Sequence, residues 1–172
     1  MAFRMEIADF GAFYERTYQL AYRTAFGIVR EPGLAADVTQ EAYAAAYAAR
    51  DRFRGESPGQ AWLHRIVVNA ALAALRHGRP VVHELPITDL GRSDDTHATA
   101  ERIALWDALE QLKPKSRAAV VLRYYHDYDY ATIAQILGTT TTNVGAILTR
   151  ALDQLRNELE QPTHPMAVRA GR

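Results

Sequence analysis

Apolar positions recur at helical spacing through most of the chain, and proline and glycine interrupt them. The first such stretch predicts a long helix from about Ile7 to Arg30 that is broken by Pro32-Gly33. A second helix is expected from about Leu34 to Asp51 and a third from about Ala61 to Arg76, and together they predict one helical domain. The second helix should pack through small residues, namely Val38, Ala42, Ala45 and Ala49.

The helical pattern is lost from Arg79 to Thr99, where two prolines and a cluster of acids predict a flexible linker. Residues 1–78 are therefore the first predicted domain, residues 100–161 a smaller second domain of four helices, and residues 162–172 a mobile tail. Ala-rich runs and the lack of an alternating strand pattern agree with this division. The predicted fold is all-α, with two small helical domains joined by a flexible linker.

A helix-turn-helix is predicted after Asp129, which can cap a short helix that ends at Gly138. Thr140 or Thr141 then caps a second helix, with a buried stripe at Val144, Leu148, Ala151 and Leu155. Its outward face carries Thr142, Ala146, Thr149, Arg150 and Asp153. This arrangement suits entry into a DNA major groove, and an ordinary helical hairpin is the alternative.

Composition limits the classes of protein that fit. The chain has no cysteine, which excludes disulfides and thiolate metal sites, and it has no apolar stretch of signal-peptide or membrane-span length. We therefore expect a cytoplasmic protein without membrane insertion. The 20 basic and 20 acidic residues give a formal net charge of zero, which counts against tight DNA binding by the chain alone.

A few residues could in principle belong to a catalytic or metal site. His126, Asp127 and Asp129 lie close in sequence, and Glu41, Glu56 and His64 are imaginable metal ligands. No HExxH, paired Glu-x-x-His or nucleophile-elbow motif accompanies them. The sequence therefore predicts no catalytic site, no metal site and no cofactor.

Asp37, Gln40 and Glu41 recur at i, i+3 and i+4, so two carboxylates and an amide share one helix face. The segment DVTQEAY that contains them, the later DRFRGESPGQAWLHRIVVNAAL, and LKPKSRAAVVLRYYHDYDYATIAQILG follow one another in that order. Over nearly the whole chain this order resembles the ECF group of sigma-70 family sigma factors. The resemblance implies core RNA polymerase, promoter DNA and an anti-sigma factor as partners.

The resemblance also implies roles for individual residues. Asp37, Gln40 and Glu41 would dock on the largest polymerase subunit, and without the resemblance a solvated helix face is the preferred reading. Minus-ten promoter contacts would come from Phe53, Arg54, Arg65, Asn69 and Arg76. For Trp62 a place in the hydrophobic core is the favoured interpretation. For Asn69 a DNA contact and a buried hydrogen-bonding role are about equally favoured.

The second predicted helix of the helix-turn-helix would contact the minus-thirty-five element through Thr141, Thr142, Asn143 and Arg150. It departs from the family at Gly145, Ala146 and Ile147, where lysine, serine and arginine are common. These residues make no hydrogen bonds to bases through their side chains, so weak upstream recognition is expected. Because this helix has few side chains that can hydrogen-bond to bases, an alternative function stays open. In this alternative the chain is a sigma-like decoy that sequesters an anti-sigma regulator.

Overall fold

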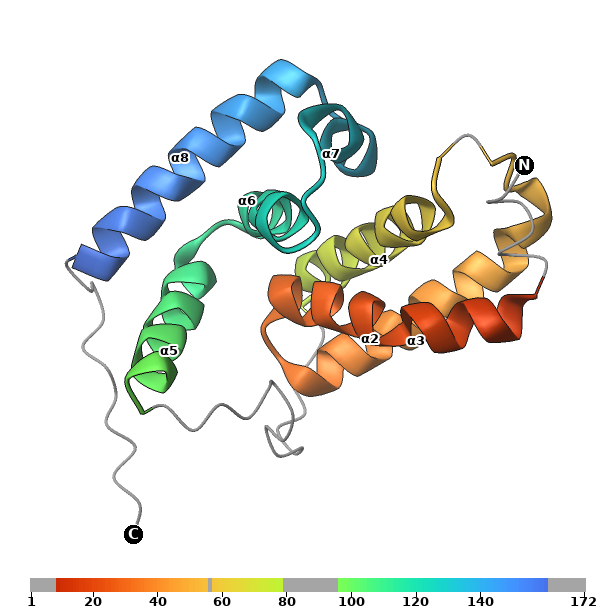
Figure 1. Ribbon diagram of the computed structural model, residues 1–172, viewed down its shortest axis with the longest axis horizontal. Helices are drawn as coiled ribbons and strands as arrows, with labels where there is room; N and C mark the ends of the chain where they lie inside the picture. The colour runs from red at the N-terminus through yellow and green to blue at the C-terminus, as the bar shows by residue number, and fades with distance from the viewer. Residues whose placement is uncertain (1–8, 56, 79–95, 161–172) are drawn as a thin grey trace, which may run out of the picture.

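The computed structural model describes residues 9–55, 57–78 and 96–160, and Figure 1 shows helices throughout these ranges. No β-strand occurs within them, and the prediction of an all-α fold is confirmed. In the same residues no helix combines the length and the apolar character needed to cross a membrane. The elements are α2 (Phe10–Val29), α3 (Pro32–Ala49), η1 (Arg50–Arg52), α4 (Gly59–Arg76), α5 (Thr96–Gln111), α6 (Pro114–Val120), η2 (Val121–Tyr125), α7 (Tyr130–Leu137) and α8 (Thr141–Glu160).

Only Arg30 and Glu31 separate α2 from α3. Arg30 takes a left-handed conformation with φ of 63°, and the carboxylate of Glu31 caps α3 by accepting from the backbone N–H groups of Gly33 and Leu34. Pro32 is the first residue of α3, a position where its missing N–H costs nothing. The second helix therefore begins two residues before the predicted start at Leu34, because proline occupies its first position and does not break the chain there.

Helices α2, α3 and α4 pack against one another and form the first unit, residues 9–78. Their contacts bury Phe13, Val38 and Leu63 almost completely. The sequence predicts that α3 packs through a face of small residues. This prediction is confirmed for Val38 and Ala42, which are fully buried, and is wrong for Ala45, which is exposed. Tyr43 and Ala46 take that place, because the packed face of α3 turns towards α2.

Helices α5 to α8 form the second unit, residues 96–160, and contain the predicted helix-turn-helix. Asp129 accepts a hydrogen bond of 2.7 Å from the N–H of Thr132, which caps α7 and lowers the pKa of the Asp129 carboxyl. Gly138 ends α7 with φ of 61°, and Thr140 Oγ1 accepts from the N–H of Asn143 to cap α8.

The predicted linker and tail lie largely outside the described residues, which omit 79–95 and 161–172. Residues 96–99 belong to α5, so helix extends into the end of the predicted linker. A second departure is η2, a π-helical turn that directly continues α6. It begins within the apolar run Val120–Leu122, where helical periodicity alone predicts no irregularity.

The two units share one continuous apolar core. Helix α4 of the first unit packs against α7, and α2 packs against α6 and η2, as the adjacent ribbons in Figure 1 show. Tight packing at this boundary brings Gly27 of α2 beside Val121 of η2. The described residues therefore form a closed arrangement of the two units.

Candidate functional site

The exposed face of α3 carries the three residues predicted to dock. Asp37, Gln40 and Glu41 are all exposed, whereas Val38 and Ala42 on the opposite face are fully buried. Burial in the core therefore does not account for this polar face, and its two carboxylates and one amide are exposed at the surface. Such a face suits arginine-rich helices, because carboxylates accept bidentate hydrogen bonds from guanidinium groups.

An exposed aromatic residue extends this face and was missed in the sequence. Tyr47 is 52% exposed and lies seven residues after Gln40, so both occupy the same side of α3. The guanidinium carbon of Arg50 lies 3.9 Å from the centre of the Tyr47 ring. The spacing of seven residues between Gln40 and Tyr47 could have placed both on one helix face. The Ala and Tyr residues of this segment instead suggested a helix side that packs in the core.

The predicted minus-ten residues of α4 lie along one side of that helix. Arg65, Asn69 and Arg76 are exposed and fall within about 40° of one another at about 100° per residue. The exposure of Asn69 rules out the alternative that it is a buried hydrogen-bonding residue. Arg54 is also exposed, in the loop that precedes α4.

Phe53 differs from the other predicted minus-ten residues. Its side chain is only 8% exposed, and its ring centre lies 5.0 Å from that of Trp62. Apolar burial against the half-buried indole holds this ring in the core, so the expectation that Phe53 stacks on a base does not fit this structure. Trp62 packs against the core as expected.

His64 precedes Arg65 on α4 but turns to the opposite side, where it is fully buried. Its Nδ1 lies 2.9 Å from the hydroxyl of Tyr128, and its ring centre lies 4.0 Å from that of His126. Burial, together with the neighbouring His126, lowers the pKa of His64 to about 3. The described residues contain no group of three or more acidic or histidine side chains suited to a metal ion, and Glu56 lies outside them.

The first turn of α8 presents Thr141, Thr142 and Asn143 to solvent, as predicted for a recognition helix. The Asn143 amide donates to Thr139 Oγ1 at 2.7 Å. One turn further along, Arg150 is exposed, and its Nε donates to the carbonyl of Ala146 at 3.1 Å. The polar groups available to DNA are therefore few, and two of them already make local hydrogen bonds.

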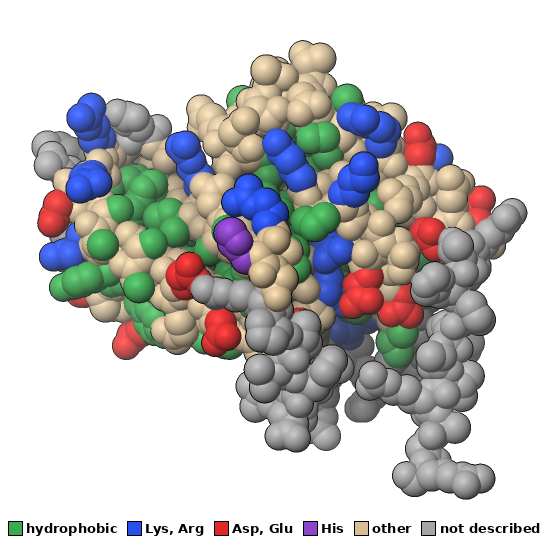
Figure 2. Space-filling model, turned by 180° about the vertical axis from the view of Figure 1, so that it is seen from behind, with side chains coloured by type: hydrophobic (Ala, Val, Ile, Leu, Met, Phe, Trp, Pro, Cys, Tyr) green, Lys and Arg blue, Asp and Glu red, His purple; other side chains and the backbone are tan. Residues whose placement is uncertain are grey.

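Zero net charge does not mean an even distribution of charge. Figure 2 shows Lys and Arg side chains spread over the upper part of one face, above most of the Asp and Glu side chains. Cationic side chains on one face suit the phosphate backbone, which supplies much of the affinity in DNA binding.

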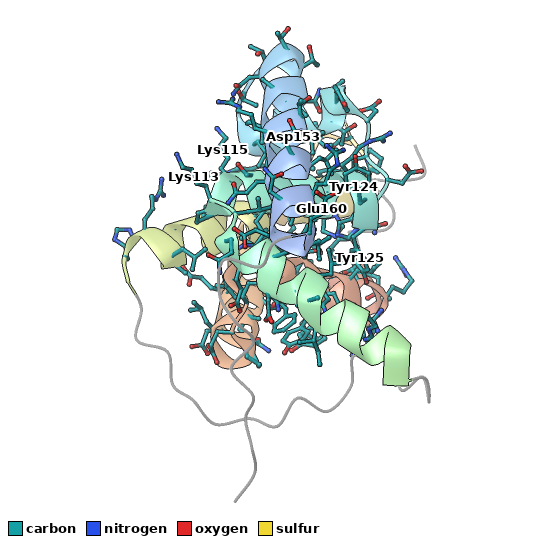
Figure 3. All side chains as sticks on the ribbon, turned by 90° about the vertical axis from the view of Figure 1, so that its left-hand side faces the viewer. Lys113, Lys115, Tyr124, Tyr125, Asp153 and Glu160 are labelled. Atoms are coloured by element: carbon teal, nitrogen blue, oxygen red, sulfur yellow. The ribbon has the colours of Figure 1, made fainter. Side chains whose placement is uncertain are left out.

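An apolar groove of about 580 Å³ lies where the two units meet. Figure 3 shows Tyr124 and Tyr125 on one side of α8, with Lys113 and Lys115 on the other. Both tyrosines are among the large exposed aromatic side chains. The groove is also lined by Arg23, Phe26, Leu105 and Trp106.

Two known sequence patterns match the chain in the order in which its units occur. Sigma-70 region 2 matches residues 13–80, and sigma-70 region 4 matches residues 102–155. The chain belongs to the sigma-70 family of RNA polymerase sigma factors. It is 31% identical over 158 residues to the RNA polymerase sigma-E factor of Streptomyces antibioticus, which covers 90% of this chain and 87% of that protein.

Other similar proteins are also sigma factors. The chain is 33% identical over 148 residues to the ECF RNA polymerase sigma factor SigM of Mycobacterium tuberculosis, covering 85% of this chain and 74% of that one. The sigma factor RpoE of Bartonella quintana, solved with the anti-sigma factor NepR, shares the fold, with a TM-score of 0.71 and 22% identity over 91% of this chain and 99% of that chain. CnrH, solved with the cytosolic domain of CnrY, also shares the fold, with a TM-score of 0.71 and 23% sequence identity. The match covers 95% of this chain and 100% of that chain.

Proposed function

We propose that this sigma factor acts in the cytoplasm, docks on core RNA polymerase through α3 and reads promoter DNA through α4 and α8. The observation that carries the proposal is the exposed face of Asp37, Gln40 and Glu41, which no packing within the chain explains. Tyr47 extends this surface with an aromatic ring, a side chain enriched at protein interfaces. Carboxylates, an amide and a ring on one helix suit a partner rich in arginine.

Minus-ten recognition is assigned to the exposed side of α4. Arg65 and Arg76 can reach phosphates or the planes of unstacked bases, and Asn69 between them can hydrogen-bond to a base edge. Arg54, in the preceding loop, is close enough in sequence to contribute to the same surface. Phe53 is left out, because its ring packs on Trp62.

Minus-thirty-five recognition is assigned to the N-terminal half of α8, through Thr141, Thr142, Asn143 and Arg150. Gly145 and Ala146 add no hydrogen-bonding side chain to this surface. Each good base contact is worth about 1–3 kcal/mol, so a helix with few of them depends on the rest of the complex for its affinity.

The partner proposed for regulation is an anti-sigma protein, as in the solved complexes of RpoE and CnrH. The apolar groove between the units supports this proposal, because its exposed Leu105, Tyr124 and Tyr125 would be covered by an amphipathic helix. Inhibition of transcription by anti-sigma proteins of the source organism can be measured on the wild type and on Leu105→Glu. The variant should escape inhibition while initiating normally without the inhibitor.

Reconstitution with core polymerase tests the main proposal. Run-off transcription, followed by sequencing of transcript starts, should give discrete starts that share upstream elements. A purified chain that binds an anti-sigma protein but never supports initiation would instead favour the decoy function.

A further inference from the structure

One side of α5 forms a wall of the apolar groove. Arg102, Leu105, Trp106 and Leu109 line the groove at i, i+3, i+4 and i+7, so they share one side of the helix over about 10 Å of its length. The wall is only partly covered by the described residues, since the Leu105 side chain is 43% exposed. This side of α5 therefore offers an elongated apolar surface with a cation at its beginning.

The charges in the groove have one sign. Its described lining residues include Arg23 on α2 and Arg102 on α5 but no aspartate or glutamate. Each arginine lies about one turn before an aromatic residue of its own helix, Phe26 on α2 and Trp106 on α5. The centres of these two rings lie 6.1 Å apart. Both helices therefore contribute a cation on the same side of one ring pair.

Arg117 lies beyond the other side of the ring pair. Its guanidinium donates to the carbonyl of Ile28 on α2 and to that of Leu109 on α5. In both helices these carbonyls come after the ring pair, whereas the two groove arginines come before it. The groove therefore has a cationic end and an apolar end, and the apolar end is the one near Arg117.

A tyrosine hydroxyl adds a donor at the cationic end. Nη1 of Arg23 donates to the hydroxyl of Tyr125 at 3.4 Å, and Tyr125 lies with Tyr124 on one side of α8 (Figure 3). A phenol that accepts from a guanidinium can still donate its own hydrogen to an anion. Guanidinium and hydroxyl donors beside each other match the two oxygens of a carboxylate.

We propose that the groove binds a free fatty acid, with the carboxylate at Arg23 and Arg102 and the acyl chain along α5 towards Leu109. The ligand joins one negative charge to an apolar chain, as the groove joins a cationic end to an apolar one. The volume of about 580 Å³ lies within the range of small-molecule sites.

Fatty acid binding goes beyond the proposed function, because it needs neither polymerase nor DNA. The amphipathic helix of an anti-sigma protein is proposed to cover the same groove. The two ligands should therefore exclude each other, and that consequence alone rests on the proposed function.

The first test compares ligands on the purified wild-type chain by calorimetry, below their micelle-forming concentrations. Dodecanoate should bind one to one with a Kd of roughly 10 µM or below. From octanoate to dodecanoate, each further methylene should lower the Kd by up to roughly fourfold. Dodecanol and dodecyltrimethylammonium carry the same chain without the negative charge, and both should bind at least tenfold more weakly than dodecanoate, because they lose the charge-assisted hydrogen bonds.

The second test places the ligand in the groove. The chain has two tryptophans, and Trp62 packs against the core of the first unit, away from the groove lining. In Trp62→Phe the emission comes from Trp106, which lines the groove, so dodecanoate should shift it with the Kd that calorimetry gives.

The third test removes the cations. Arg23→Gln, Arg102→Gln should raise the Kd for dodecanoate at least tenfold and leave that for dodecanol unchanged. Arg16→Gln, Arg156→Gln is the matched control, because it removes two exposed guanidinium groups outside the groove lining and should bind dodecanoate like wild type. Circular dichroism checks the fold of both variants.

Three results would each overturn the proposal: equal binding of dodecanoate and dodecyltrimethylammonium by wild type, dodecanoate binding without a change in Trp106 emission, and equal losses in the two double variants. An absence of dodecanoate binding would overturn it as well. None of these measurements uses polymerase, so the proposed function stands or falls separately, by run-off transcription.

Discussion

The two units differ in what they leave on their surfaces. The first unit exposes carboxylates, an amide and an aromatic ring on α3, and two arginines with an asparagine on α4. The second unit exposes mostly hydroxyls and methyl groups on the recognition half of α8, where Asn143 and Arg150 already make local hydrogen bonds. Binding affinity should therefore come chiefly from the first unit, whereas the second positions the complex on DNA.

Charge reversal on α3 should have the largest effect. In Asp37→Lys, Glu41→Lys, two carboxylates that pair with cations in a desolvated contact become lysines. The loss should be about 3 kcal/mol, or roughly a hundredfold in the Kd for core polymerase. Affinity can be measured by fluorescence anisotropy, with circular dichroism to check the fold.

The matched control for that variant is Glu15→Lys, Glu160→Lys, which makes the same charge change at exposed carboxylates away from α3. It should bind polymerase like wild type. Equal losses in both double variants would mean that net charge, and not the α3 face, determines docking.

Much of the second unit could be predicted because its signals are local. The Asp129 cap, Gly138 and the Thr140 cap each act within one helical turn, so residue type and spacing were sufficient. The buried stripe of α8 was also predicted correctly, since amphipathic periodicity marks it without knowledge of the partner helix.

The α4 surface should give the second largest effect. Removing the guanidinium and amide groups in Arg65→Ala, Asn69→Ala should weaken open-complex formation by about 2 kcal/mol, roughly thirtyfold. Permanganate footprinting of the holoenzyme on promoter DNA measures this. Arg156→Ala, Asn157→Ala removes the same groups from the far half of α8 and should change little. A larger effect from this second pair would reverse the comparison of the two units.

The contacts between the two units could not be predicted, because they join residues far apart in sequence. Thr24 and His126 lie 102 residues apart, and His64 and Tyr128 lie 64 apart. Local patterns placed His64 on the same helix as the proposed DNA contacts and read Phe53 as a loop aromatic. Only the packing of α4 on α7 and of Phe53 on Trp62 assigns both residues to the interior.

Acidification should weaken the closed arrangement, in which the two units pack together, relative to an open state in which they separate. Burial lowers the pKa of His64 to about 3 and that of His126 to about 4 in the closed state. In the open state both should return to about 6.5, so the open state binds more protons below that pH and closure weakens as pH falls. Lowering the pH from 7 to 6 should favour opening about tenfold, or about 1.4 kcal/mol. The other ionisable groups around the pair are Tyr125, Tyr128, Arg123 and Asp127.

Because the chain has no cysteine, dyes can be attached at Gln19→Cys on α2 and Gln135→Cys on α7, both exposed positions, and energy transfer between them measures this pH response. His126→Asn should reduce the response to that of one histidine, whereas His77→Gln, at an exposed position, should leave it unchanged. A response that survives in His126→Asn but disappears in His77→Gln would assign the titration to the surface.

The smallest effect is expected on α8. Arg150→Ala should reduce run-off transcription from the full promoter by about fivefold, or about 1 kcal/mol, the low end for an arginine–base contact. The reason is that Nε of Arg150 already donates to the carbonyl of Ala146, which leaves only the terminal nitrogens for DNA.

The reduction should vanish on a promoter whose minus-thirty-five element is scrambled, and Arg156→Ala should not reproduce it. The full chain is the appropriate protein, because the second unit shares its core with the first. If Arg150→Ala costs more than Arg65→Ala, Asn69→Ala, then the second unit supplies affinity as well as position, and the division of roles between the units fails.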